Sequence, residues 1–279
     1  MILQEDKPIS EVHDLIVGKI RKYFSDCGMK DAVLGLSGGI DSAVVYTLAA
    51  EALGKDHVMG ILMPSQFSSM HSISDAVDLA NNVGGKFEII PIEKIYSVYM
   101  IEMKRFFPTS EWSVALENLQ ARIRGNILMT YSNKANALLL NTSNKSELCM
   151  GYGTMYGDLC GAMMVIADLY KLQVYELAKY INRGGEVIPI SSIEKAPSAE
   201  LHKDQKDSDT LPPYDILDPV LHSLVEEGLD AEDVIKGGAD RKLVERIVAL
   251  KARSSFKLAQ IPPVITVGNA PLVPDFKRI

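Results

Sequence analysis

The stretch that best suits phosphate chemistry is Ser-Gly-Gly-Ile-Asp-Ser, residues 37–42. A short apolar run over 32–36 comes before it, and apolar residues at helical spacing follow over 43–53, so we expect a buried strand, a tight turn and a helix. Gly38 and Gly39 carry no Cβ and would let backbone N–H groups come close to a ligand. The start of the helix would add unpaired N–H groups and about half a positive charge. Together these features predict that the turn binds phosphate.

Asp41 indicates that a cation accompanies the phosphate. A carboxylate at this position would repel phosphate on its own, but it is favourable if a divalent cation such as Mg²⁺ lies between the two. The turn lacks the lysine of a G-x-x-x-x-G-K-[ST] loop and does not match the G-x-G-x-x-G dinucleotide turn. It resembles instead the PP-loop of the N-type ATP pyrophosphatases, which split ATP between its α and β phosphates and adenylate a substrate oxygen. An ordinary glycine turn before a capped helix is the alternative.

Strand-like and helix-like patterns alternate over residues 8–140, which predicts an α/β fold. Crossovers of this length are typical of a doubly wound, mostly parallel sheet, and we expect five strands, extra C-terminal helices and one domain over 1–279. The expected strands that can be located cover residues 32–36, 57–63, 87–90 and 137–140, and the expected helices cover 8–27, 41–53, 72–84, 92–106, 111–134, 168–181, 218–227 and 239–252.

In such a sheet, ligands bind past the carboxyl ends of the strands. The turn 37–42 and the loop that follows Met63 would both lie at this edge. We therefore expect the backbone of Leu36 and Met63 to contact adenine and ribose, although Met63 is equally suited to the core at a strand end. The polar segment 186–213 contains four prolines, and we expect it to be a mobile connection that lies over the site.

Composition excludes several classes of protein. A formal net charge of −7 argues against nucleic acid as a main partner, because binding to the phosphate backbone is largely electrostatic. The three cysteines form no C-x-x-C pair and are expected to be free thiols in a reducing compartment. The acidic N-terminus has no signal-peptide core, and no run of 18 apolar residues occurs, so we expect a cytoplasmic protein with no membrane partner.

Further motifs indicate which group of PP-loop proteins the sequence resembles. They are Asn-Leu-Gln-Ala-Arg (118–122), LLLNTSNKSELCMGYGTMYGD (138–158), DLYKLQVYELAKYIN (168–182), KAPSAEL (195–201) and DSDTLPPYDILD (207–218). In this order they resemble the synthetase domain of NAD synthetases, which amidate nicotinic acid adenine dinucleotide (deamido-NAD) to NAD. The resemblance covers about residues 37–218 and recurs weakly near Lys257.

The resemblance implies roles for individual residues. Asp41 and Lys171 would be catalytic, and Asp41 and Glu147 would bind Mg²⁺. Glu147 would contact the dinucleotide in another branch of the family, and it could simply cap the short helix after Asn144. The residues expected at ATP are Leu36, Ser37, Gly38, Gly39, Ile40, Asp41, Ser42, Met63, Thr142 and Lys171. The residues expected at deamido-NAD are Asn118, Arg122, Glu147, Tyr152, Gly153, Thr154, Met155 and Lys257.

The implied reaction consumes ATP and ammonia, forms an adenylated dinucleotide and releases AMP and pyrophosphate. The wording of the motifs is closer to the glutamine-linked branch, whose N-terminal glutaminase domain we do not expect, because only 36 residues precede Ser37. Ammonia from a separate glutaminase chain stays open. The resemblance also implies a homodimer, with the helix 111–134 as its expected interface. Two alternatives remain: a related amidating enzyme, GMP-synthetase-like for instance, and a nucleotide-binding module without catalysis.

Overall fold

A five-stranded parallel sheet forms the centre of the computed structural model, which describes residues 7–106, 113–202, 205, 211–268, 272–273 and 277–279. Its strand order is β3-β2-β1-β4-β5, and every pairing is parallel. The strands are β1 (Asp31–Gly35), β2 (Val58–Leu62), β3 (Lys86–Ile89), β4 (Ala137–Asn141) and β5 (Met163–Met164). The order reverses at β1, which confirms the predicted doubly wound α/β fold.

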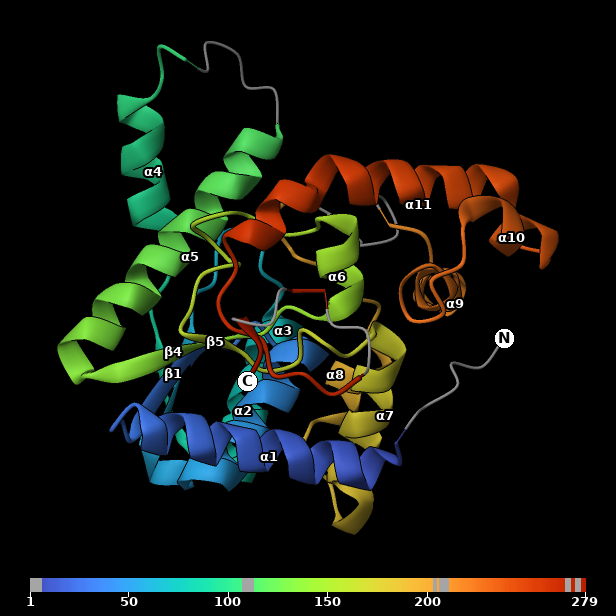
Figure 1. Cartoon of the computed structure of the whole chain (residues 1–279). Helices are drawn as coiled ribbons and strands as arrows, with labels where there is room; N and C mark the ends of the chain where they lie inside the picture. The colour runs from blue at the N-terminus through green and yellow to red at the C-terminus, as the bar shows by residue number, and fades with distance from the viewer. Residues whose placement is uncertain (1–6, 107–112, 203–204, 206–210, 269–271, 274–276) are drawn as a thin grey trace.

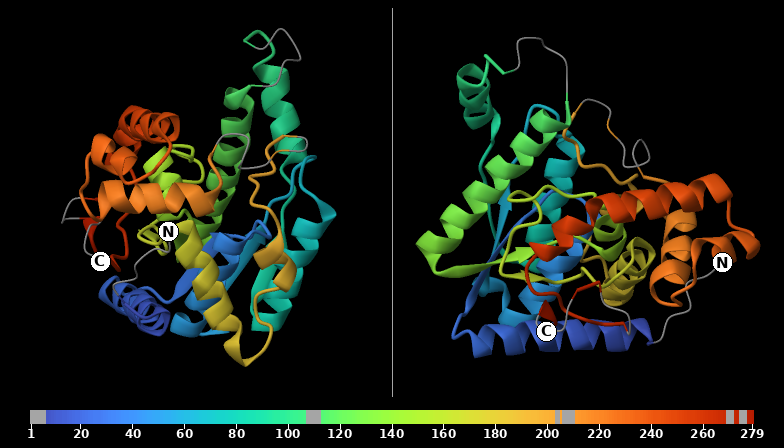
Figure 2. Two further views of the ribbon diagram at one scale, coloured as in Figure 1. Left: turned by 90° about the vertical axis from the view of Figure 1, so that its right-hand side faces the viewer. Right: turned by 45° about the horizontal axis from the view of Figure 1, so that its top comes forward.

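Helices cover both faces of the sheet (Figures 1 and 2). Alternate residues of β1 point to opposite faces, so Ala32 and Leu34 join one apolar cluster and Val33 joins another. The first cluster packs α1 (Ile9–Asp26), α2 (Ile40–Leu53), α3 (Met70–Val83) and α7 (Lys171–Ile181). The second packs against α5 (Val114–Ala135), which α4 (Glu93–Glu102) contacts in turn.

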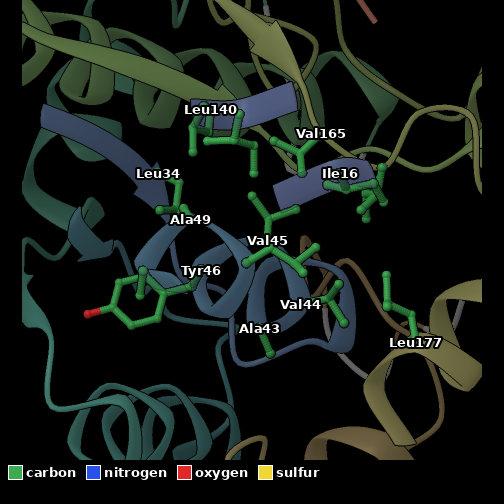
Figure 3. Packing of buried hydrophobic residues seen from close by; sticks show 14 of the residues in the cluster. Ile16, Leu34, Ala43, Val44, Val45, Tyr46, Ala49, Leu140, Val165 and Leu177 are labelled. Atoms are coloured by element: carbon green, nitrogen blue, oxygen red, sulfur yellow. The ribbon is translucent and has the colours of Figure 1, made fainter. Parts of the chain in front are cut away.

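The helix that follows the Ser-Gly-Gly turn is the most enclosed element of the first layer. Ten of the 14 residues of α2 are buried, because α1, α3 and α7 surround the sides that the sheet does not cover. Figure 3 shows Val44, Val45 and Ala49 packed among side chains of the sheet and of α1 and α7. Such packing holds the N-terminus of α2, and therefore the turn before it, in one position.

The C-terminal helices form a further apolar cluster beside the sheet (Figure 1). They are α9 (Tyr214–Val225), α10 (Ala231–Lys236) and α11 (Arg241–Ser254), and they pack on α6 (Lys145–Met150). The connection from α7 to α9 contains α8 (Ile190–Glu194), which the sequence did not predict. None of the described helices is both long enough and apolar enough to cross a membrane.

Helix α7 begins three residues later than the predicted helix 168–181. Asp168 is held outside the helix because its Oδ2 accepts hydrogen bonds from the N–H groups of Val267 (2.7 Å) and Gly268 (2.9 Å). Its Oδ1 accepts a bond from the Lys145 ammonium (2.9 Å), which also bonds Glu226. Burial disfavours the charge on Lys145, but the two carboxylates outweigh burial and raise its pKa.

Replacing Lys145 with Met should destabilise the protein, because it leaves the buried Asp168 carboxylate without its cation. The expected loss is about 3–5 kcal/mol of unfolding free energy, measured by denaturant titration. Lys179→Met is the matched control, since Lys179 pairs with Glu176 at the surface and such pairs are worth about 0–1 kcal/mol. Equal stability of the two variants would contradict this account of the ion cluster.

Candidate active site

A cavity of about 290 Å³ opens at the carboxyl ends of β1, β2 and β4, the edge at which ligands of such sheets bind. Its walls come from the turn after β1, the loop after β2, helix α5, the segment after β4 and the connection that contains α8. Of the residues expected at ATP, the cavity is lined by Leu36, Ser37, Gly39, Ile40, Asp41, Ser42, Met63, Thr142 and Lys171.

Gly38, within the Ser37–Ser42 turn, packs against Ser72 of α3 and is not among the residues that line the cavity. Its φ of +79° is in the left-handed region, and a Cβ at this position would lie 2.1 Å from the carbonyl oxygen of Ser72. The hydroxyls of the two serines brace the turn: Ser37 Oγ accepts a bond from Gly39 N (3.2 Å), and Ser42 Oγ accepts one from Ser37 N (3.3 Å). The turn thus directs the N-terminus of α2 toward the cavity.

The buried Lys171 and the partly exposed Asp41 form an ion pair next to this turn. Lys171 is the first residue of α7 and is 2% exposed, and Asp41 lies in the first turn of α2. Asp41 accepts the Lys171 ammonium with one carboxylate oxygen and Asn144 Nδ2 (3.1 Å) with the other. Burial disfavours the charge on Lys171, but Asp41 and Glu147 outweigh it and raise its pKa. A permanent positive charge therefore lies at the end of the cavity that the Ser37–Ser42 turn lines.

Glu147 caps α6 and also lines the cavity. Asn144 Oδ1 accepts a bond from Glu147 N (3.0 Å), and the Glu147 carboxylate accepts one from Asn144 N (3.3 Å), a reciprocal capping box. The capping alternative raised by the sequence is thus present, and it leaves the carboxylate at the cavity, where its charge raises the pKa of Lys171.

Asp41 and Glu147 could hold a cation only together with other ligands. Within the described part of the chain, no three His, Cys, Asp or Glu side chains gather into a metal site. Mg²⁺, however, commonly uses one or two protein carboxylates and takes its other ligands from water and substrate phosphates. The donor set at the cavity therefore fits a Mg²⁺ ion that arrives with a nucleotide.

The residues expected at deamido-NAD form a second group, most of it outside the cavity wall. Thr154 Oγ1 donates to Asn118 Oδ1 (2.7 Å), and Arg122 Nε donates to the carbonyl of Met155 (3.2 Å), so α5 holds the loop 151–158. Lys257 Nζ, in the segment that follows α11, donates to the carbonyls of Gly151 (2.7 Å) and Gly153 (2.6 Å). Only Glu147 and Tyr152 of the expected set line the cavity itself.

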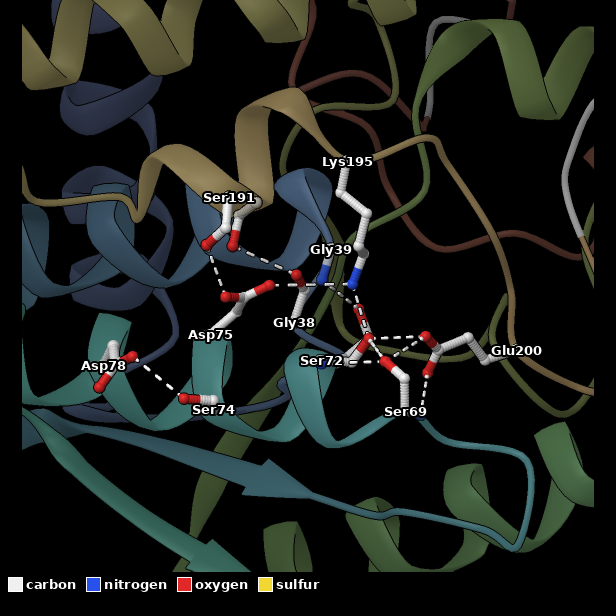
Figure 4. Close-up of polar contacts among 12 residues, drawn as sticks. Gly38, Gly39, Ser69, Ser72, Ser74, Asp75, Asp78, Ser191, Lys195 and Glu200 are labelled. Atoms are coloured by element: carbon white, nitrogen blue, oxygen red, sulfur yellow. Dashed lines mark hydrogen bonds and ion pairs between the residues drawn. The ribbon is translucent and has the colours of Figure 1, made fainter. Parts of the chain in front are cut away.

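The segment that follows α8 covers the cavity and is bound to the N-terminus of α3 (Figure 4). The Glu200 carboxylate accepts bonds from Ser69 N (3.1 Å), Ser69 Oγ (2.9 Å) and Ser72 Oγ (2.7 Å). Lys195 Nζ donates to Ser72 Oγ (2.6 Å), and Ser192 Oγ donates to Gly38 O (3.2 Å). Residues 195–201 of this segment and Ser192 of α8 line the cavity. The mobility of the segment stays a prediction, and residues 203–204 and 206–210 lie outside the described part.

Arg124 is a site residue that sequence reasoning missed. It lines the cavity from α5, and its Nε donates to the carbonyl of Met63 (3.0 Å). Burial lowers its pKa to about 10, and the nearby charges of Asp158 and Glu200 limit the decrease, so it stays charged at neutral pH. The sequence feature that could have indicated Arg124 is its neighbour Gly125, a glycine inside a long helix. A Cβ at Gly125 would lie 3.0 Å from the carbonyl oxygen of Gly157, so α5 and the loop 151–158 approach each other closely at this point.

Comparison with known proteins identifies the family of the chain. A family model described as NAD synthase matches residues 12–261. The glutamine-dependent NAD(+) synthetase of Synechocystis sp. is 47% identical over 259 residues, which are 93% of this chain and 46% of that protein. The chain spans about half the length of the curated relatives that it matches.

Two solved structures match this chain over nearly their whole length. The NH3-dependent NAD synthetase of Campylobacter jejuni is 31% identical with a TM-score of 0.73, over 93% of this chain and 99% of that one. The NMN synthetase of Francisella tularensis is 29% identical with a TM-score of 0.78, over 90% and 96% of the two chains. On its sequence and on its fold, this chain belongs to the NAD synthase family.

Proposed function

We propose that this protein is a ligase that amidates deamido-NAD to NAD with ammonia, at the expense of ATP and with Mg²⁺. The observation that carries the proposal is the Lys171–Asp41 ion pair beside the Ser-Gly-Gly turn, at the sheet edge of a chain of the NAD synthase family. A permanent cation and a helix N-terminus at one end of a cavity suit a departing polyanion.

In the first proposed step, an oxygen of the nicotinate carboxylate attacks the α-phosphorus of ATP. The bond from this phosphorus to the oxygen that bridges to the β-phosphorus breaks, and pyrophosphate leaves with the electron pair. The N–H groups at the start of α2 and the Lys171 ammonium would stabilise the charge that develops on the leaving group. The protein's main contribution is to hold two large substrates in line.

In the second step, ammonia attacks the carbonyl carbon of the mixed anhydride. The bond from this carbon to the AMP oxygen breaks, a proton leaves the nitrogen, and the products are the amide of NAD and AMP. No covalent bond to the protein is needed. Burial raises the pKa of the Cys149 thiol to about 12 and that of Cys160 to about 11, so both thiols stay protonated at neutral pH.

Asp41 and Glu147 are the residues that would hold Mg²⁺, because both line the cavity and a cation would lie between their carboxylates and the phosphates. When bound, the ion would neutralise phosphate charge. The group around Asn118, Arg122 and loop 151–158 is proposed to bind the dinucleotide, because Tyr152 of this loop lines the cavity. A cytoplasmic location stays a prediction.

We further propose a homodimer in which α4 and α5 contribute to the interface. Several large apolar side chains of this helical pair are exposed, among them Val98 (60%), Ile101 (70%) and Val114 (67%), and burying them would be favourable. Sedimentation velocity at micromolar concentrations should show a dimer that Ile101→Glu weakens. A wild-type protein that sediments only as a monomer would contradict this.

The direct test of the function is an assay for NAD, AMP and pyrophosphate with deamido-NAD, ATP and Mg²⁺. Parallel reactions contain ammonium or glutamine as nitrogen source, and nicotinic acid mononucleotide or a purine nucleotide as alternative acceptor. We expect equal amounts of the three products with ammonium and deamido-NAD, and little product in the other reactions.

Each other result selects a different function. Product only with the mononucleotide would place the chain with the chemistry named for the Francisella structure. Product only with a purine nucleotide would favour a GMP-synthetase-like enzyme. ATP binding with no pyrophosphate from any acceptor would leave a nucleotide-binding module without catalysis.

Glu147→Gln separates the capping role of this residue from its proposed metal role. Glutamine can complete the same capping box, so the variant should keep its unfolding free energy within about 0.5 kcal/mol. Without the carboxylate charge, it should need about tenfold more Mg²⁺ for half-maximal activity, measured by titrating the metal. Glu147→Ala, which loses both roles, is the comparison. An unchanged Mg²⁺ requirement in Glu147→Gln would show that capping is the residue's only role.

A further inference from the structure

The first two turns of α9 contact the start of α7, where Lys171 lies. Asp218, in this part of α9, is fully buried. Its Oδ1 accepts a hydrogen bond from Ser146 Oγ (2.5 Å), and its Oδ2 accepts one from the backbone N–H of Leu172 (2.9 Å). Ser146 Oγ in turn accepts the N–H of Lys171 (2.9 Å). One carboxylate thus joins α9 to both α6 and α7.

These contacts use the backbone groups that the start of a helix leaves without partners. Lys171 and Leu172 are the first two residues of α7, so their N–H groups have no acceptor within the helix. Ser146 and Asp218 supply acceptors for these two groups. Ser146 directly precedes Glu147 in α6. The bond from Lys171 N to Ser146 Oγ therefore also limits the distance between Lys171 and Glu147, the two residues of α7 and α6 that are expected around the phosphates.

A second residue of α9 contacts the side chain itself. Tyr214 lies four residues before Asp218, on the same side of the helix, and the centre of its ring lies 5.5 Å from Lys171 Nζ. An aromatic face attracts an ammonium and restricts its position without removing its charge. The Lys171 ammonium therefore contacts both the ring of Tyr214 and the carboxylate of Asp41.

We propose that Asp218 and Tyr214 are positioning residues for Lys171: Asp218 holds its backbone through Ser146 and Leu172, and Tyr214 holds its ammonium. This inference rests on the proposed function, in which Lys171 stabilises the departing pyrophosphate. Neither residue is among those that line the cavity, so both are expected to act through Lys171. Misplacing a catalytic group by about 1 Å can lower a rate 100-fold, so such supports matter for turnover.

The test is a double-mutant cycle between Asp218→Asn and Lys171→Met. Asparagine keeps the size of the side chain but cannot accept both hydrogen bonds. In the wild-type background, Asp218→Asn should lower kcat/KM for ATP about 10- to 100-fold. In the Lys171→Met background it should cause a further loss of less than about threefold, because residues that act as a unit are not additive. ATP affinity, measured by calorimetry, should follow the same pattern.

Matched variants separate positioning from general damage. Asp215→Asn alters an exposed carboxylate of the same helix and should keep wild-type activity. Tyr214→Phe keeps the ring and should stay within about twofold of wild type, whereas Tyr214→Leu should resemble Asp218→Asn. If Asp218→Asn does not fold, Ser146→Ala removes the same link to Lys171 N and takes its place in the cycle.

Equal losses in both backgrounds would overturn the proposal, because they would make Asp218 a structural residue only. Full activity of Asp218→Asn, or of Tyr214→Leu, would overturn it as well. If the wild-type protein makes no NAD, the proposed function fails, but the calorimetric cycle on ATP binding still decides whether α9 positions Lys171.

Discussion

The ion pair between the buried Lys171 and Asp41 is the interaction on which the site depends. It joins residues 130 positions apart in the sequence and brings the N-termini of α2 and α7 to one place. An ammonium at 2% exposure is costly unless carboxylates and hydrogen bonds compensate. Asp41 and Glu147 supply that compensation, and the raised pKa of Lys171 is its consequence. The carboxylates therefore keep the Lys171 ammonium charged although it is buried.

The surrounding fold serves to hold this pair. Helix α2 is enclosed on nearly all sides, so Asp41 has little freedom, and Asn144 bonds its second oxygen. The capping box of α6 holds Glu147, and the bonds from Ser146 and Asp218 hold the start of α7. With two carboxylates against one ammonium, these three side chains leave one negative charge uncompensated. A divalent cation would offset this charge and part of the charge of an entering polyphosphate.

The parts of the site that could be predicted from sequence are the local ones. The strand, the Ser37–Ser42 turn and the helix lie within about 20 consecutive residues, and their pattern needs no distant partner. The two-residue strand β5 was too short to show a period, and the start of α7 was set by Asp168 bonding distant backbone groups at Val267. Lys171 itself was found by resemblance, since a lysine at a helix start has no distinctive local pattern.

The remaining site residues act through contacts between segments far apart in the chain. Arg124 reaches the carbonyl of Met63, and Glu200 reaches Ser69 and Ser72 across 131 and 128 positions. Nothing in the local spacing of these residues indicates such partners. Glu147 shows a different limit: a capping residue can also line the cavity, so its local pattern does not distinguish a structural role from a ligand-binding one.

The central claim is that Lys171, held by Asp41, stabilises the departure of pyrophosphate. It is tested most directly by the exchange of labelled pyrophosphate into ATP, without ammonia, in the wild-type protein and in Lys171→Met. The account predicts that exchange requires deamido-NAD and falls at least about 100-fold in Lys171→Met, the usual scale for losing one charge-stabilising group. Exchange that is undiminished in Lys171→Met would contradict it.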